Sequence, residues 1–180
     1  PYSVGKDRWN GHRMYAAGTY LCEGDYVMYL DEDNFLDPDH VESCMKTISS
    51  GRDWTFSFRK IVDKEGTFIC NDECESLGSW PSVLDSKDYF IDVNCYFLPK
   101  VLAVHVSPIW YRKAREPNVP EVDRVLCPTL REIAKNNQGT MKHTVNYTVG
   151  NTERSVKADF FLQGNEIMKK RYANKLPWRV

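Results

Sequence analysis

The feature that most constrains the fold is a short apolar run that ends abruptly in acidic residues. Tyr26–Leu30 carries no charge and is followed directly by Asp31-Glu32-Asp33-Asn34. An apolar run without alternation is typical of a strand that is covered on both faces, as in a parallel sheet. On each side of this run, the spacing of apolar residues predicts a helix, one within Asp7–Cys22 and another after Asp37-Pro38. Helix, buried strand, acidic turn and helix form an α/β unit, in which ligands bind beyond the carboxyl ends of the strands.

The spacing also predicts which face of each flanking helix is buried. In the first helix, which Asp7 caps, the expected buried residues recur at i, i+3, i+4 and i+7: Met14, Ala17, Gly18 and Leu21. In the second helix Asp37 is the expected cap and Pro38 opens the first turn. The expected buried residues there are Val41, Cys44, Met45 and Ile48.

The remaining segments complete a single α/β domain over residues 1–180. Turn residues separate two expected strands into a hairpin, with the first strand half-exposed. A loop, a further strand, an irregular proline-rich segment and a closing strand and helix follow. In order, these segments are Trp54–Val62 and Thr67–Cys70 for the hairpin, Asn71–Lys87, Tyr89–Leu98, Pro108–Pro120, a helix from Glu121 that Pro128 kinks or divides, Thr144–Val149 and Gly164–Tyr172.

Composition excludes several classes of protein. Of the 180 residues, 42% are hydrophobic, which excludes a disordered chain. The 24 Lys and Arg against 25 Asp and Glu give a formal net charge of −1, so we expect no nucleic-acid partner.

No apolar run approaches the ~20 residues of a transmembrane helix, and we expect a cytoplasmic protein, peripheral to a membrane if its acceptor resides there. The six cysteines are expected as free thiols, with disulfides or a zinc site as alternatives.

Asp31 and Asp33 are the sharpest candidates for chemistry. Two carboxylates two residues apart at the tip of a strand can reach one hard cation, and Mg²⁺ and Mn²⁺ prefer such oxygen ligands. A bound ion of this kind neutralises a diphosphate leaving group. One alternative is that both residues only cap the following turn. A calcium loop is disfavoured because Phe35 and Leu36 occupy the third ligand position and the required glycine.

At Gly24–Asp33, with Leu36 and Pro38 after it, the sequence resembles the metal-binding segment of GT-A-fold glycosyltransferases, especially those of family 2. Further blocks similar to these enzymes follow in order along nearly the whole chain: Trp9–Arg13, Ile91–Tyr96, Asp123–Leu126 and Phe160–Asn165. The resemblance implies a GT-A-like mixed sheet flanked by helices. It also implies transfer of a sugar from a nucleotide-diphosphate donor to a hydroxyl of a glycan or other acceptor, with Mn²⁺ or Mg²⁺ on the diphosphate.

The resemblance assigns roles to individual residues. Asp33 would be the main metal ligand, Asp31 would contact the metal through water or the donor ribose, and Asp123 would be the general base of an inverting enzyme. Asp123 has the alternatives of a helix cap or an ion-pair partner of Arg124 or Arg131, and Glu121 competes for its role.

Other candidates contact the donor or the acceptor. We expect Asn10, Arg13, Asp31 and Glu32 at the donor, although Arg13 could equally belong to a solvated face. Trp80 is a candidate for stacking on a sugar ring, with a local structural anchor as the alternative. Asp92 and Asn94 are expected to alternate on one strand face, where they either bind sugar hydroxyls or satisfy each other internally.

One departure from the family pattern matters. Members usually begin with a strand, a helix and a second strand that grip the nucleotide base, whereas few residues here precede the first helix. We therefore expect an N-terminally truncated piece of the domain. Two other functions stay open: a catalytically inactive sugar- or nucleotide-binding module of the same fold, and a metal-dependent nucleotidyltransferase or phosphohydrolase.

Overall fold

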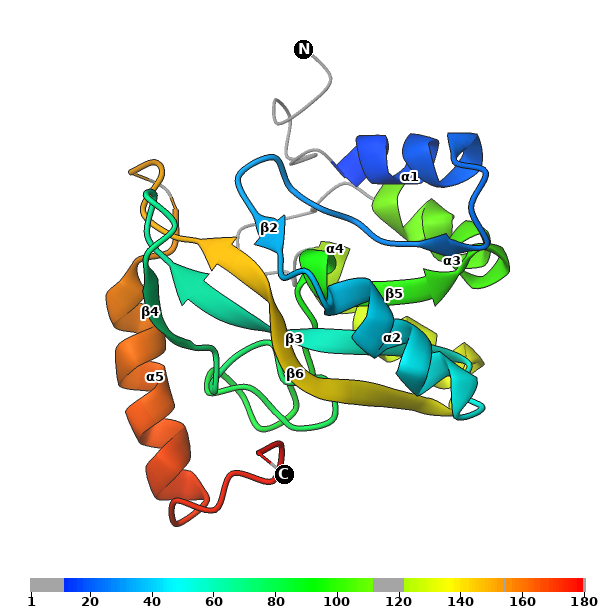
Figure 1. The fold of residues 1–180 in the computed structure, drawn as a ribbon. Coiled ribbons are helices and arrows are strands. Elements are labelled where there is room, and N and C mark those ends of the chain that lie inside the picture. The colour runs from blue at the N-terminus through cyan, green and yellow to red at the C-terminus, as the bar shows by residue number, and fades with distance from the viewer. Residues whose placement is uncertain (1–11, 112–121, 154, 180) are drawn as a thin grey trace.

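Six strands form one curled, mixed sheet with helices packed around it (Figure 1). The structure, a computed structural model, describes residues 12–111, 122–153 and 155–179. The sheet order is β1-β5-β3-β6-β2, with β4 paired to β3. The strands are β1 (Tyr26–Val27), β2 (Phe35–Leu36), β3 (Trp54–Val62), β4 (Phe68–Asn71), β5 (Tyr96–Pro99) and β6 (Asn137–Thr148). The expected single α/β domain with a mixed sheet flanked by helices is confirmed at this level.

Strand β3 runs through the middle of the sheet. It pairs parallel with β6 and antiparallel with β4 and β5, and of its residues only Lys60 is not buried. The expected hairpin into β4 is confirmed, with Gly66 of its turn at φ 81°. The expectation of a half-exposed strand is wrong, because helix α2 and the buried loop 72–78 both pack against β3.

The strand before the acidic turn differs from the prediction. β1 has two residues, pairs antiparallel with β5 and lies at the end of the sheet order. Val27 and Tyr29 are buried, whereas Met28 and Leu30 are exposed. The run is therefore covered on one face only, and its lack of polar residues does not reflect a parallel strand buried on both faces.

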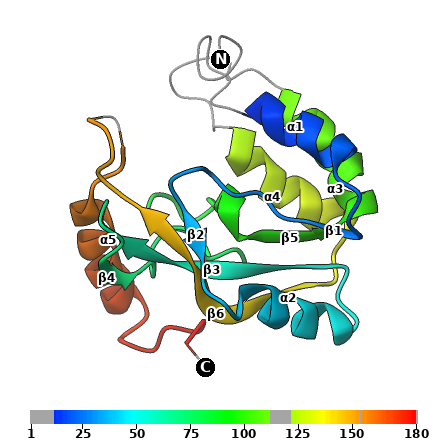
Figure 2. The same cartoon turned by 45° about the horizontal axis from the view of Figure 1, so that its top comes forward.

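Helices surround the sheet on several sides (Figures 1 and 2). Helix α2 packs on β3 and β6, helix α5 packs on β4, and α1, α3 and α4 gather at the β1–β5 end. The helices are α1 (His12–Leu21), α2 (His40–Ser49), α3 (Lys100–Val106), α4 (Val122–Ile133) and α5 (Ala158–Arg171), with 3₁₀ turns η2 (Val93–Cys95) and η3 (Ser107–Tyr111). Pro128 lies inside α4 without dividing it. None of the helices in the described ranges is long and apolar enough to span a bilayer.

The buried face predicted from spacing is wrong for α1 and partly right for α2. In α1, Met14 and Leu21 are exposed, whereas the buried residues are His12, Ala16 and Thr19. Thr19 tolerates burial because its hydroxyl donates to the carbonyl of Tyr15, 2.7 Å away, and lies 3.0 Å from the Tyr29 hydroxyl. In α2, Cys44 is buried as expected, and Met45 and Ile48 are half-buried. Val41 is exposed, and His40 and Ser43 are buried as well.

Asp37 does not cap α2 with its side chain. The helix begins at His40 after Asp39, and the Asp37 carboxylate instead pairs with Lys60 of β3 at 2.5 Å. Its other oxygen accepts a hydrogen bond from Asn146 of β6 at 2.8 Å. Asp37 therefore ties the segment before α2 to the sheet.

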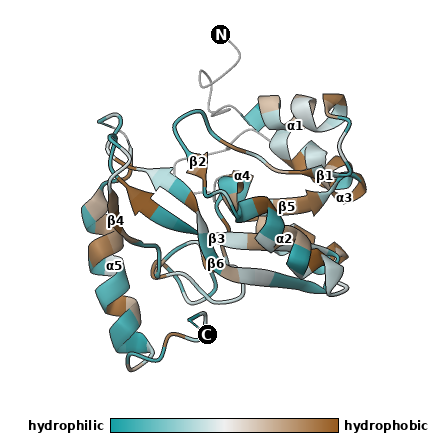
Figure 3. Ribbon diagram, viewed as in Figure 1, coloured by the Kyte–Doolittle hydropathy of each residue, from teal (hydrophilic) through white to brown (hydrophobic). Residues whose placement is uncertain are grey.

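Figure 3 shows the contrast on which the site depends: the segment leading from β1 is hydrophobic, and the turn before β2 is hydrophilic.

The loop that the sequence predicts after the hairpin is present, yet residues 72–78 are buried. Its backbone is satisfied by the Asp72 carboxylate, which accepts N–H groups of Cys74, Glu75 and Ser76 at 2.9, 2.9 and 3.0 Å.

Candidate functional site

The acidic turn is anchored through Asp31. The Tyr15 hydroxyl of α1 donates to one carboxylate oxygen of Asp31, and Asn94 Nδ2 donates to the other at 2.9 Å. The backbone N–H of Asp31 donates to Asn94 Oδ1 at 2.7 Å. Burial raises the pKa of Asp31, and the hydrogen bonds from Tyr15 and Asn94 act in the opposite direction. The carboxylate thus has a fixed position and orientation.

Asp33 stands on the same turn in a different environment. It is exposed, and its carboxylate accepts a hydrogen bond from Asn151 at 2.7 Å. The Thr148 hydroxyl, at the end of β6, donates to the Asp33 carbonyl oxygen. Thr148 and Asn151 therefore hold the turn at Asp33, as Asn94 holds it at Asp31.

An open depression of about 570 Å³ lies beside Asp33. Its lining comes from the acidic turn, the β3–β4 turn and the end of β6: Glu32, Asp33, Phe35, Lys64, Glu65, Gly66, Thr148, Asn151 and Thr152. Its residues are mostly polar, and Phe35 offers an exposed ring. A polar ligand that contacts Asp33 would find both hydrogen-bonding groups and an aromatic surface here.

The turn alone does not make a closed metal cage. Across the described residues, no group of three or more His, Cys, Asp or Glu side chains is placed to hold a metal ion. Mg²⁺ in enzymes commonly takes only one or two carboxylates and completes its coordination with water and substrate phosphates. The exposed carboxylate of Asp33 is a hard oxygen donor of the kind that such an open site uses, whereas both oxygens of Asp31 already accept hydrogen bonds from Tyr15 and Asn94.

Asp92 and Asn94 do not alternate on a strand, so that expectation is wrong. They lie at the 3₁₀ turn η2 that precedes β5, and Asp92 caps this turn by accepting the Asn94 N–H at 3.0 Å. Asn94 Nδ2 also donates to Asp92 at 2.8 Å. Both residues are buried, and their polar groups are hydrogen-bonded within the protein. Of the two expected roles, the geometry therefore favours an internal network over binding of sugar hydroxyls.

Sequence reasoning missed Arg59, the buried cation on which this network depends. Its side chain is almost inaccessible and forms ion pairs with Asp92 at 2.5 Å, with Asp72 at 2.8 Å and with Glu75. The ring of Tyr147 lies 4.4 Å from the guanidinium carbon. No local signal marked Arg59, because the alternation in Trp54–Val62 places it on the face opposite Phe56 and Phe58, where a half-exposed strand meets solvent.

The predicted base Asp123 lies in the first turn of α4, as expected. One of its oxygens accepts the backbone N–H of Arg124 at 2.8 Å. The Arg124 side chain turns to Asp88 and Glu75, at 2.5 Å from each. Burial of the Tyr96 hydroxyl raises its pKa, and the Asp123 carboxylate adds to this effect. Glu121, the rival for the role of base, lies outside the described residues.

The remaining predicted residues are more scattered. Trp80 is half-buried, and its ring lies 5.5 Å from that of Trp178. Arg13 lies 5.6 Å from the ring centre of Tyr111, and Asn10 lies outside the described residues. Glu32 is exposed on the acidic turn beside Asp33. The structure thus brings Asp31, Asp92 and Asn94 together and leaves Trp80 in a separate aromatic cluster.

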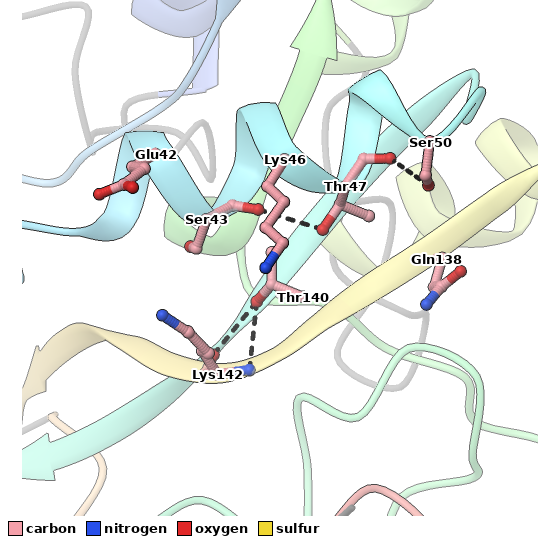
Figure 4. Close-up of a pocket in the computed structure, with 8 residues that line it drawn as sticks. All are labelled: Glu42, Ser43, Lys46, Thr47, Ser50, Gln138, Thr140 and Lys142. Atoms are coloured by element: carbon pink, nitrogen blue, oxygen red, sulfur yellow. Dashed lines mark hydrogen bonds between the residues drawn. The ribbon is translucent and has the colours of Figure 1, made fainter.

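A second depression, of about 380 Å³, separates α2 from the first half of β6 (Figure 4). It is lined by Glu42, Ser43, Lys46, Thr47, Ser50, Gln138, Thr140 and Lys142. None of these residues belongs to the acidic turn, and the hydroxyls of Ser43, Thr47 and Ser50 donate to carbonyls of their own helix. This surface therefore contributes nothing to the site around Asp31 and Asp33.

Comparison with known proteins adds no family to this description. No protein-family model matches the sequence, and no curated protein matches it. The function is therefore argued from the geometry of the site.

Proposed function

We propose that this chain is a glycosyltransferase domain that uses Mn²⁺ or Mg²⁺ and transfers a sugar, with inversion, from a nucleotide-diphosphate donor to an acceptor hydroxyl. The observation that carries the proposal is the construction of the acidic turn. One carboxylate, Asp31, is fixed from two sides, and the other, Asp33, is exposed beside an open polar depression. A turn with this much negative charge would repel a diphosphate, so we infer that a divalent cation lies between them.

The residues of the turn divide the work of holding the donor. Asp33 supplies the direct ligand, and Asp31 contacts either the metal, through a water molecule, or the donor ribose. When bound, the ion would neutralise the charge on the diphosphate leaving group. Glu32 and Arg13 are the donor contacts that we propose among the described residues. The position of Asp31 is set before the donor binds, which lowers the cost of ordering the site.

The chemical step needs a base. The acceptor oxygen attacks the anomeric carbon, the bond from that carbon to the diphosphate oxygen breaks, and the acceptor proton passes to the base. We propose Asp123 for this role because a carboxylate at hydrogen-bonding distance can take the proton as the new bond forms.

Replacement of Asp33 by asparagine tests the metal role. Asp33→Asn keeps the size of the side chain and removes its charge, so sugar transfer with Mn²⁺ present should fall by about 10²-fold or more. The assay measures product formation from a panel of nucleotide-sugars and hydroxyl acceptors. Asp25→Asn is the matched control, since Asp25 is exposed and precedes β1.

The same assay separates the other two functions. Equal rates for Asp33→Asn and the wild-type protein would contradict the metal role. Release of phosphate or nucleoside phosphate with no modified acceptor would instead indicate a phosphohydrolase or nucleotidyltransferase. Binding of nucleotide-sugar without any turnover would indicate an inactive binding module.

A further inference from the structure

A continuous path of polar side chains joins the acidic turn to helix α4. It consists of six residues, which we name the relay: Asp31, Asn94, Asp92, Arg59, Glu75 and Arg124. We propose that the relay fixes the acidic turn relative to the start of α4, and that Asn94 and Glu75 are positioning residues for sugar transfer. The catalytic part of this inference rests on the proposed function, whereas the mechanical coupling does not.

Asn94 forms the end of the relay at the acidic turn. Its Oδ1 accepts the Asp31 backbone N–H at 2.7 Å, and its Nδ2 donates to Asp31 at 2.9 Å and to Asp92 at 2.8 Å. Asn94 is 1% exposed, so water does not compete for these bonds. An amide held by three bonds has one orientation, and it passes that orientation to the turn.

Arg59 forms the middle of the relay. A guanidinium presents its donors in a rigid planar fork, so its carboxylate partners are held in fixed directions. Asp92 and Glu75 occupy two arms of this fork. The rings of Tyr147 and Phe161, at 4.4 and 5.1 Å, pack against the guanidinium. The centre of the relay therefore has little freedom to rotate.

Glu75 carries the relay to α4. One of its oxygens accepts from Arg59, and the other accepts from Arg124 at 2.5 Å. Arg124 follows Asp123 directly in the first turn of α4. One end of the relay thus lies at Asp31, which the proposed function places at the donor. The other end lies beside Asp123, which the proposed function makes the acceptor of the proton.

A merely stabilising role explains this arrangement less well. Replacing a buried ion network by well-packed apolar residues is often neutral or stabilising, so stability alone gives no reason to join these two segments. The need to place the reacting groups accurately does give a reason, because a misplacement of about 1 Å can lower the rate by about 10²-fold.

The first experiment measures coupling without any substrate. In Glu75→Gln, one oxygen becomes an amide nitrogen that faces a guanidinium, so the bridge between Arg59 and Arg124 is broken. We expect hydrogen exchange of the Asp31 amide to become at least about 10-fold faster, although Glu75 does not touch that amide. Glu73→Gln is the matched control, because Glu73 is buried in the same loop but binds Trp178 and Arg179.

The outcomes are distinct. Faster exchange at Asp31 in Glu75→Gln and unchanged exchange there in Glu73→Gln supports the relay. Equal exchange in both variants overturns it. If Glu75→Gln does not fold, Arg124→Gln breaks the same bond from its more exposed side and is expected to give the same exchange result.

The second experiment tests the catalytic consequence. We expect Glu75→Gln to lower kcat for sugar transfer by about 10²-fold at an unchanged KM for the donor, since the groups that contact the donor are unaltered and only their position relative to α4 is loosened. Glu73→Gln should keep its kcat. A loss of kcat that follows the loss of thermal stability equally in both variants would overturn the positioning role. If the wild-type protein transfers no sugar, the proposed function fails, and the exchange experiment still decides the relay.

Discussion

At the scale of single residues, Asp31 and Asp33 are two positions apart yet do different things. Asp31 is half-buried and held by Tyr15 and Asn94, and burial raises its pKa. Asp33 is exposed and has Asn151 as a partner. The exposed carboxylate can exchange an amide partner for an ion at little cost, whereas the buried one would first lose its anchors. This difference is the reason to assign the direct ligand to Asp33.

The residue-scale prediction concerns the base. Asp123→Asn removes the proton acceptor and leaves the acidic turn intact, so sugar transfer should fall by about 10²–10⁴-fold while Mn²⁺-dependent binding of a nucleoside diphosphate is retained. Steady-state kinetics and calorimetric titration measure the two properties. Glu121→Gln is the comparison, because Glu121 is the rival for the role. A larger loss in Glu121→Gln than in Asp123→Asn would reverse the assignment.

The sequence could indicate the acidic turn and Asp123, but it could not indicate what holds them. Asn94 is 63 positions from Asp31 in the sequence, and Tyr15, on helix α1, is 16 positions away. A local pattern carries no information about such hydrogen bonds, which depend on how the elements pack. The same holds for Arg59, since strand alternation places it on the polar face of Trp54–Val62, and its carboxylate partners come from loop 72–78 and the start of η2.

At the scale of elements, the sequence could predict the β3–β4 hairpin and helix α4. Local turn residues and the spacing of apolar residues define both. Exposure could not be predicted in the same way. β3 is buried by α2 and by loop 72–78, and α1 buries His12 and Thr19 while it exposes Met14 and Leu21. The buried face of a helix follows hydrogen-bonding partners and packing as well as hydrophobicity.

Loop 72–78 owes its close packing on β3 to a glycine. Gly78 has φ +61°, and a Cβ there would lie 2.4 Å from Cζ of the buried Phe56. Gly78→Ala combines left-handed strain of about 1–2 kcal/mol with overpacking of about 1–3 kcal/mol. We therefore expect the free energy of unfolding to fall by about 2–5 kcal/mol in urea titrations.

The control for this prediction is Gly51→Ala. Gly51 also has a positive φ, +87°, but a Cβ there meets no atom within 4 Å. Only the backbone cost of about 1–2 kcal/mol should remain. Equal losses at the two positions would show that the contact with Phe56 does not limit the loop.

At the scale of the whole molecule, one buried cation organises the part of the domain between the sheet and α4. Burial alone would raise the pKa of Asp72, but Arg59 and the N–H groups of Ser76 and Cys74 outweigh it, so the pKa of Asp72 lies below its usual value. A lowered carboxylate pKa stabilises the fold above pH about 4 and loses this contribution as the pH falls through the folded pKa.

Arg59→Met tests this account of stability. The variant leaves buried carboxylates without their cation and should lower the free energy of unfolding at pH 7 by about 3–5 kcal/mol. Protonation of these carboxylates relieves the penalty, so the difference between variant and wild type should shrink as the pH approaches about 4. Urea titrations at both pH values measure it. A penalty that is the same at pH 7 and pH 4 would contradict the electrostatic explanation.

The central claim is that the acidic turn binds a divalent cation that in turn holds a diphosphate. The most direct test is a crystal grown with Mn²⁺ and a saturating nucleoside diphosphate, with anomalous scattering recorded for manganese. We predict an anomalous peak in contact with the Asp33 carboxylate and with oxygens of the diphosphate. Bound diphosphate with no manganese peak at Asp33 would contradict the claim.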